Sequence, residues 1–189
     1  MTNTNTRKLI YTITCVAMNV ALITICSWIS IPYVISFTMQ TFAIFLISAL
    51  FSWKVSILSV LAYILLGMVG VPVFTGFRAG AAAILGTTGG YIVGFLFTAL
   101  IVSLGIRALG RKPWVMIVSM LAGLFVCYAF GTAWYMVLYI RNTGAASLTS
   151  VLFACVFPFI LPDCVKILLA TFLARRIYPH LPPDLQNKI

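Results

Sequence analysis

Two charged residues three positions apart interrupt the last apolar run of the chain. Asp163 and Lys166 belong to the sequence LPDCVK. Residues i and i+3 share one face of a helix, so we expect the two side chains to touch. A charge at the centre of a bilayer costs about 2.5–3.5 kcal/mol on insertion scales, and such residues usually face a cavity or a partner. We therefore favour a ligand-contacting pair, an anionic acceptor beside a cationic donor, over an internal ion pair that only locks the last helix.

The position of this pair along its helix points to the outer half of the membrane. Asp163 precedes Arg175, at the end of the run, by a distance of about 18 Å at the rise of an α-helix. Pro162, immediately before Asp163, cannot donate a backbone hydrogen bond and tends to kink or start a helix. We expect the backbone there to open toward a cavity.

A second candidate cluster is the sequence GTTGGY, which ends with Gly89, Gly90 and Tyr91. Its glycines permit close approach of the backbone to a ligand or to a neighbouring helix. Tight helix packing is slightly favoured over a binding loop on the pattern alone. The phosphate-loop pattern G-x-x-x-x-G-K-[ST] does not occur in the sequence, so we expect no ATPase site in this chain.

Three further features are candidates for contacts with a substrate or with other proteins. Ala17 and Ala21 form a small-x-x-x-small pair, which lets helices approach closely in lipid, within this chain or with another. Gln40 lies at membrane depth and can bind a ligand or bond to another helix. Arg78, in a predicted outer loop, is also a candidate substrate contact. The apolar segment 31–37 is either a lid or a short connection.

Composition places these residues in an integral membrane protein. The 189 residues are 63% hydrophobic and 7% charged, with a mean hydropathy of +1.16, whereas soluble domains are about 25% charged. The net charge of +10 is scattered between apolar runs, unlike the basic stripe of a nucleic-acid-binding protein. The five cysteines lie in apolar runs without a C-x-x-C motif, so we interpret them as small hydrophobic residues. One histidine and two acids leave little for metal binding or acid–base catalysis, and we expect no cofactor and no metal.

The apolar runs predict an all-α protein with six transmembrane helices in one membrane domain, 1–189. A span needs about 20 apolar residues, and the second run is short. The expected spans are about 9–29, 38–51, 55–74, 91–106, 114–140 and 148–174.

The distribution of Lys and Arg predicts that both ends of the chain lie in the cytoplasm, because cytoplasmic segments are enriched in these residues. In this orientation the outer loops hold only Arg78 and Arg141. The inner segments hold Arg7, Lys8, Lys54, Arg107, Arg111, Lys112, Arg175, Arg176 and Lys188.

Several stretches, in order over nearly the whole chain, resemble the BioY family, the biotin-specific substrate-capture (S) component of energy-coupling-factor (ECF) vitamin transporters. The Asp163–Lys166 pair in the last span belongs to this resemblance. Thr87 stands where the family pattern has a proline. The other matching stretches are Ile31-Pro32 to Gln40-Thr41, LAYILLG ending at Gly67, GVPVF ending at Phe74, and TGGYIVGF ending at Phe95.

The resemblance implies both an architecture and a set of roles. Six helices would enclose biotin near the outer face of the cell membrane, beneath a loop between the first two helices. Asp163 and Lys166 would contact biotin, and Tyr91 would take the place of the family's aromatic residue after its paired glycines. Ala17 and Ala21 would meet the coupling membrane subunit, with an ATPase pair supplying the energy for release into the cytoplasm.

Other functions stay open at this stage. The chain could capture a different vitamin, work as a solitary facilitator, or act as a structural subunit. An integral membrane enzyme acting on lipid is disfavoured, because no His, Cys and acid group together near one depth and Asp163 is the only acid in a predicted span. We expect a multi-pass protein of the cytoplasmic membrane that is not an enzyme and binds no nucleic acid.

Overall fold

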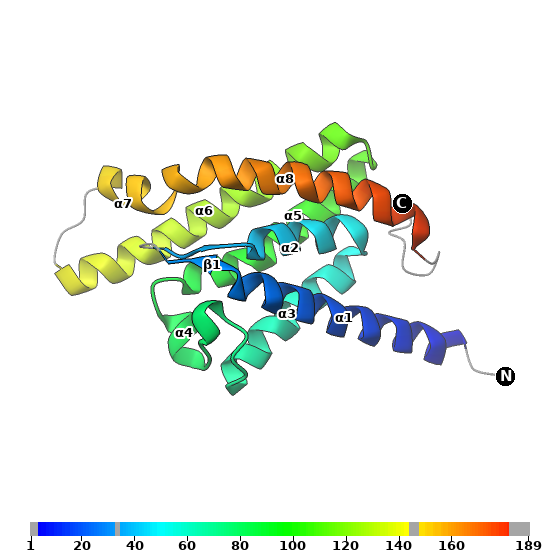
Figure 1. The fold of residues 1–189 in the computed structure, drawn as a ribbon, viewed down its shortest axis with the longest axis horizontal. Helices are drawn as coiled ribbons and strands as arrows, with labels where there is room; N and C mark the ends of the chain where they lie inside the picture. The colour runs from blue at the N-terminus through cyan, green and yellow to red at the C-terminus, as the bar shows by residue number, and fades with distance from the viewer. Residues whose placement is uncertain (1–3, 33–34, 144–147, 182–189) are drawn as a thin grey trace.

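The structure is a computed structural model that describes residues 4–32, 35–143 and 148–181. It is almost entirely helical (Figure 1), so the expectation of an all-α protein is confirmed. The helices are α1 (Thr4–Trp28), α2 (Gln40–Leu50), α3 (Trp53–Val69), α4 (Ala81–Leu85), α5 (Gly89–Leu109), α6 (Pro113–Thr143), α7 (Leu148–Cys155) and α8 (Phe157–Ile177), with 3₁₀ turns η1 (Thr75–Phe77) and η2 (Tyr178–His180). Two short antiparallel strands, β1 (Ser30–Ile31) and β2 (Phe37–Thr38), join α1 to α2.

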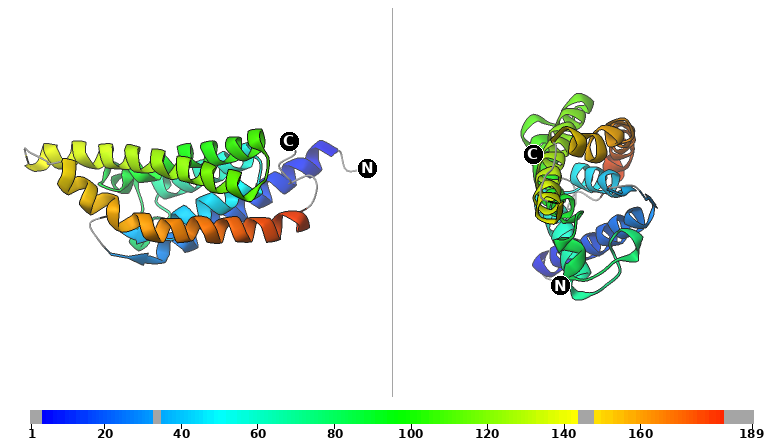
Figure 2. Two further views of the ribbon diagram at one scale, coloured as in Figure 1. Left: turned by 90° about the horizontal axis from the view of Figure 1, so that it is seen from above. Right: turned by 90° about the vertical axis from the view of Figure 1, so that its left-hand side faces the viewer.

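Helix α2 lies inside the bundle and packs against α1, α5 and α8 (Figures 1 and 2). Nearly every residue from Gln40 to Leu50 is buried. A helix that is apolar on all sides is stable only when it is covered on all sides. This central position explains why so short a helix has such a continuous apolar sequence.

The outer surface of the bundle is apolar, whereas many polar side chains point inward. Leu9, Phe125 and Leu161 are 59%, 73% and 77% exposed, while Asn19 and Ser59 are buried and hydrogen-bonded to each other at 3.0 Å. This arrangement suits a lipid solvent, in which exposed side chains can be apolar and polar groups must find partners within the protein.

Helices α5 and α6 pack closely along their length through glycine. A Cβ atom added to Gly131 of α6 would lie 2.4 Å from the ring of Tyr91 on α5, and one added to Gly90 would lie 2.3 Å from Cβ of Trp134. Small residues allow this approach in a membrane, where dispersion contacts between helices replace the hydrophobic effect. The interlocked pair forms a stable wall beside the candidate site.

Within the described part of the chain, four segments are by length and composition apolar enough to cross a membrane, namely Lys8–Trp28, Gly89–Leu109, Pro113–Arg141 and Thr149–His180. The apolar helices α2 and α3 are shorter. The run expected at 148–174 is divided between α7 and α8 at Val156, whose backbone leaves the helical region and is followed by Pro158 in the first turn of α8. The glycine-rich segment before α5 contains the short helix α4.

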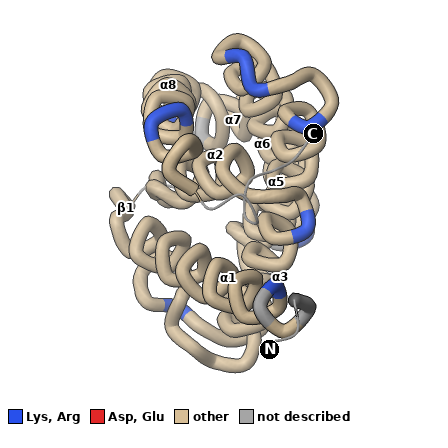
Figure 3. Tube along the Cα trace, turned by 90° about the vertical axis from the view of Figure 1, so that its right-hand side faces the viewer, with Lys and Arg blue, Asp and Glu red and all other residues tan. Residues whose placement is uncertain are grey.

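Lys and Arg gather at the end of the bundle where both chain termini lie. Figure 3 looks onto this end and shows basic residues on several helix ends, including that of α8. Arg78 and Arg141 lie away from this cluster, in the loop before α4 and near the end of α6. The residues at the termini-bearing end are Arg7, Lys8, Lys54, Arg107, Arg111, Lys112, Arg175 and Arg176.

Candidate ligand-binding site

A cavity of about 70 Å³ lies among β2, the start of α2, the loop before α4, α5, the middle of α6 and the first half of α8. Apolar and aromatic side chains such as Phe74, Phe95 and Phe159 form part of its wall. The charged and hydrogen-bonding side chains on the wall include Thr38, Gln40, Thr41, Arg78, Tyr91, Tyr128, Asp163 and Lys166.

Asp163 and Lys166 form an ion pair at this cavity. The Lys166 Nζ atom lies 2.7 Å from Asp163 Oδ1, and the two side chains are 5% and 3% exposed. Both belong to α8, one helical turn apart, so the i, i+3 spacing brings the charges together as the sequence predicted. Pro162, which precedes the pair, lies inside α8 rather than at its start.

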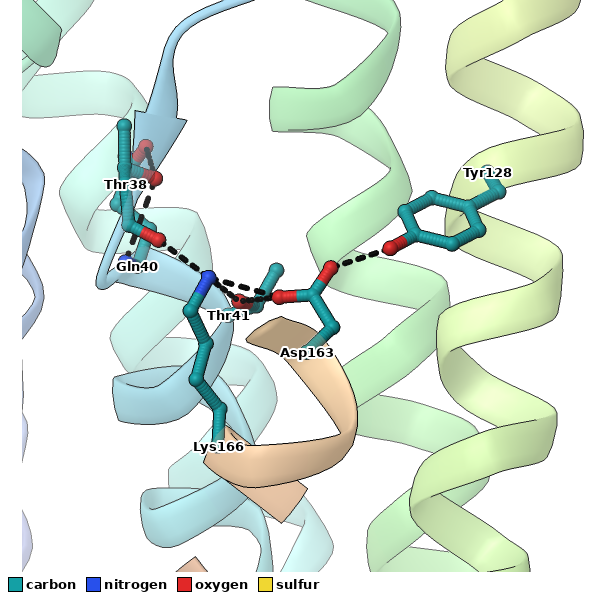
Figure 4. A network of polar contacts seen from close by, with 6 residues as sticks. All are labelled: Thr38, Gln40, Thr41, Tyr128, Asp163 and Lys166. Carbon is teal, nitrogen blue, oxygen red and sulfur yellow. Dashed lines mark hydrogen bonds and ion pairs between the residues drawn. The ribbon is translucent and has the colours of Figure 1, made fainter. Parts of the chain in front are cut away.

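The ammonium group of Lys166 ties α8 to the start of α2. It donates to the Thr38 carbonyl at 2.6 Å and to Thr41 Oγ1 at 3.1 Å (Figure 4). It also lies 3.9 Å from the centroid of the Phe37 ring. Together with the bond to Asp163 these contacts use all three N–H donors of a lysine. A new acceptor can bind Lys166 only by displacing one of them.

The carboxylate of Asp163 is held from both sides. Thr41 Oγ1 donates to Oδ1 at 3.0 Å, and the hydroxyl of Tyr128 on α6 donates to Oδ2 (Figure 4). An ionised carboxylate offers about four acceptor positions, so Asp163 keeps acceptor capacity on Oδ2. The arrangement therefore presents a fixed anion to the cavity.

Gln40 lies on the cavity wall, and its amide is already bonded within the protein. Its Nε2 donates to the Tyr63 hydroxyl at 2.7 Å, and its Oε1 accepts from Thr38 Oγ1 at 3.0 Å and from Thr75 Oγ1 at 3.2 Å. Tyr63 in turn donates to the Val73 carbonyl at 3.0 Å. This chain of bonds connects α2, α3 and the loop before α4 around one side of the cavity.

In the predicted glycine cluster, Tyr91 lines the cavity, whereas Gly89 and Gly90 pack closely against other parts of the chain. Tyr91 lines the cavity, with its hydroxyl 3.3 Å from Thr132 Oγ1 and 3.5 Å from the Cys155 carbonyl. Gly90 packs against Trp134, and a Cβ added to Gly89 would lie 1.5 Å from the Ile84 carbonyl oxygen. Neither glycine lies on the cavity wall, so both position Tyr91 through close backbone packing.

Arg78 reaches the cavity from the loop before α4. Its side chain is exposed, and its Nε donates to the Thr75 carbonyl at 3.1 Å. The remaining N–H groups of the guanidinium are available to an anion at the cavity mouth, because a guanidinium carries five donors.

The remaining predicted residues lie away from the cavity. Ala17 and Ala21 are exposed on the outer face of α1, where another protein or lipid can reach them. All five cysteines are free, and all except Cys164 are buried. Across residues 4–32, 35–143 and 148–181, no three His, Cys, Asp or Glu side chains group as a metal site.

Three residues that bond to the Asp163–Lys166 pair were not predicted: Tyr128, Thr41 and Thr38. Thr41 could have been predicted, because it directly follows Gln40 at the start of the same helix. Tyr128 had no such signal, because it is one of many aromatic residues in apolar runs and meets Asp163 only in the folded chain.

Comparison with known proteins relates nearly the whole chain to one family. The BioY family model matches residues 1–183. The "Biotin transporter BioY" of Thermotoga maritima is 34% identical over 158 residues, covering 83% of this chain and 89% of that protein. The "Probable biotin transporter BioY" of Pyrococcus horikoshii is 36% identical over 163 residues, covering 86% and 93%.

A solved structure has the same fold. It is the crystal structure of "the S-component for biotin from an ECF-type ABC transporter", which superposes with a TM-score of 0.82 at 26% sequence identity and 95% coverage of both chains. The similarity thus extends over the full bundle, including the helices that carry the cavity.

Proposed function

The chain belongs to the BioY family, and on that premise we propose that it captures biotin at the outer face of the cytoplasmic membrane for uptake into the cell. The observation that carries this proposal is the buried Asp163–Lys166 ion pair on the wall of a largely apolar cavity. Small-molecule sites are mostly apolar with a few fixed polar groups, as this one is. The named biotin transporters among its relatives support the choice of ligand.

The chemistry of biotin fits the polar groups of the cavity. Its ureido ring has two N–H donors and a carbonyl, and its side chain ends in a carboxylate. In the proposed complex, Asp163 accepts from a ureido N–H, and Lys166 donates to the ureido carbonyl. Arg78 binds the carboxylate near the cavity mouth, since a guanidinium matches a carboxylate with two parallel hydrogen bonds.

Binding of biotin requires a change in the contacts of Lys166. Because Lys166 already uses its three donors, the ureido carbonyl of biotin must displace one of its present acceptors. We expect this to be the Thr38 carbonyl, because β2 belongs to a short hairpin. We infer that biotin releases β2 from Lys166, and that Ile35 and Ser36, which precede β2 on the cavity wall, cover the ligand.

The proposed topology has six spans, α1, α2, α3, α5, α6 and α8, with both ends in the cytoplasm. The concentration of Lys and Arg at the termini-bearing end supports this orientation, which places the cavity toward the outer face. Release into the cytoplasm would be driven by a coupling membrane subunit and an ATPase pair, and the exposed Ala17 and Ala21 of α1 would contact the coupling subunit. The similarity to an S-component of an ECF-type ABC transporter supports such partners.

Direct binding tests the ligand. The purified chain in detergent is equilibrated with labelled biotin and challenged with unlabelled biotin, thiamine or riboflavin. Saturable binding that only biotin displaces is expected. The absence of saturable biotin binding, together with saturable binding of labelled thiamine or riboflavin, would assign the chain to a different ligand.

Biotin methyl ester tests the orientation. The ester lacks the carboxylate charge, so Arg78→Gln is expected to weaken the binding of biotin about tenfold and that of the ester much less. An equal loss for both ligands would remove Arg78 from the carboxylate contact.

A further inference from the structure

A second cavity lies at the opposite end of the bundle from the biotin site. It has a volume of about 180 Å³ and is lined by Arg111, Met116, Arg175, Tyr178 and Pro179. These residues come from the loop between α5 and α6, the first turns of α6, the last turn of α8 and η2. The cavity is therefore formed where the start of α6 meets the end of α8, at the end of the bundle that carries most Lys and Arg.

Arg111 is fixed at the base of this cavity by contacts within the protein. Its Nη2 atom donates to the Ala49 carbonyl at the end of α2 at 2.5 Å, and its guanidinium carbon lies 3.3 Å from the centroid of the Tyr178 ring. The Nε atom is buried and has no hydrogen-bond partner in the described part of the chain. Arg111 thus caps α2 and keeps a positive charge that no described acid neutralises.

Arg175 supplies a second cation, which, unlike Arg111, does not cap α2. It is exposed in the last turn of α8 and lines the cavity, whereas its neighbour Arg176 is directed to the ring of Phe172, 5.6 Å from the centroid. Cations at a helix C-terminus complement the helix dipole, and this applies to both arginines equally. Of these two arginines, only Arg175 lines the cavity.

The electrostatic surroundings favour an anion. Arg107 and Lys112 flank the same loop, and the sole acid among the described residues is Asp163, which pairs with Lys166 at the other cavity. Burial lowers the pKa of Arg111 from its ordinary value, because the charged form is partly desolvated. Two guanidinium groups around one cavity match the oxygens of a phosphate group.

The cavity lies beside apolar side chains that face the lipid. Trp114 and Leu109, next to the loop that carries Arg111, are 57% and 62% exposed, and Phe172 on α8 is 60% exposed. Tryptophan is enriched at the level of lipid headgroups, and basic pockets between transmembrane helices bind anionic headgroups. We propose that the cavity between Arg111 and Arg175 binds the phosphate headgroup of an anionic phospholipid, whose acyl chains lie along the neighbouring apolar surface of the bundle.

This site is separate from biotin binding, and its test does not depend on biotin. The purified chain is examined by native mass spectrometry with added phosphatidylglycerol, phosphatidylcholine or inorganic phosphate. We expect retained phosphatidylglycerol adducts, few phosphatidylcholine adducts, and no retention of phosphate alone. Arg175→Gln is expected to weaken phosphatidylglycerol binding about tenfold, and the matched control Arg176→Gln, with the same change in net charge, about twofold or less.

Two outcomes would overturn the proposal. Equal losses for Arg175→Gln and Arg176→Gln would mean that the lipid responds only to general positive charge. The second concerns Asp184, which lies outside the described residues. If wild type retained no phosphatidylglycerol selectively and Asp184→Asn did retain it, the anion in the cavity would be a carboxylate of this chain. Since Arg111 also caps α2, Arg111→Gln is not used, and thermal unfolding of each variant confirms that it is folded.

Discussion

Replacing Asp163 by Asn removes one charge from the ion pair and preserves the shape of the side chain. Lys166 is 4% exposed and would keep its charge, but it would lose the carboxylate as an acceptor. The Thr38 carbonyl and Thr41 Oγ1 would remain as its acceptors. Breaking a buried pair by removing one partner typically costs about 3–5 kcal/mol. Asp163→Asn alone is therefore expected to lower the thermal stability of the protein in detergent markedly.

Adding Lys166→Gln removes the second charge and separates stability from binding. Breaking the pair is costly because it leaves an uncompensated buried charge, and the double variant has no such charge, so it is expected to regain most of the lost stability. Its affinity for biotin should stay low, because each charge-assisted hydrogen bond contributes about 1.5–3 kcal/mol, equivalent to a Kd about 10- to 100-fold higher.

Both quantities are measured on the same purified samples, by equilibrium dialysis with labelled biotin and by thermal unfolding followed by tryptophan fluorescence. Ser59→Ala is the matched control, because it removes a buried hydrogen bond to Asn19 away from the cavity. The control should lose some stability and retain its affinity for biotin. If the double variant regained stability and bound biotin with the wild-type Kd, the pair would be a structural lock and the proposed role would be wrong.

The other predictions concern the wall of the cavity, the packing of the bundle and the outer face of α1. Tyr128→Phe should raise the Kd for biotin about tenfold in equilibrium dialysis, because Asp163 loses one hydrogen bond that fixes it; an unchanged Kd would show that the hydroxyl is dispensable. Gly131→Ala should lower stability by about 1–3 kcal/mol, measured by thermal unfolding, because the new Cβ would collide with the ring of Tyr91. Ala129→Leu, at an exposed position of the same helix, should have little effect, and equal losses would contradict the packing argument. Ala17→Leu and Ala21→Leu should reduce biotin uptake by cells that also make the coupling subunits and leave the Kd of the purified chain unchanged, whereas a raised Kd would place their effect within the bundle.

The local parts of the site were predictable from the sequence. Asp163 and Lys166 stood out because charge is nearly absent from the apolar runs, and their spacing of three residues sets their proximity on any helix. Helical content followed from the same apolar runs. These inferences need only the sequence near each residue.

The contacts between distant segments were not predictable in this way. Tyr128 reaches Asp163 from another helix, and the Thr38 carbonyl reaches Lys166 from a short strand, so both depend on how the bundle packs. From the sequence, Gly89 and Gly90 could serve either helix packing or ligand binding. Their closeness to Ile84 and Trp134 in the folded chain favours packing.

The break in the last apolar run could also not be predicted from the sequence. Pro162 indicated a kink, but hydropathy cannot tell a kinked span from two helices. The backbone leaves the helix at Val156, before Pro158, and continues as a helix through Pro162.

Uptake of labelled biotin tests the central proposal most directly. A host that requires biotin and lacks its own transporter is given this chain with coupling and ATPase subunits of an ECF transporter. Rapid, saturable uptake is expected with the wild-type chain and is expected to fall to background with the Asp163→Asn, Lys166→Gln double variant at equal membrane abundance. Equal uptake by the two chains, or none by the wild type despite its presence in the membrane, would contradict the account.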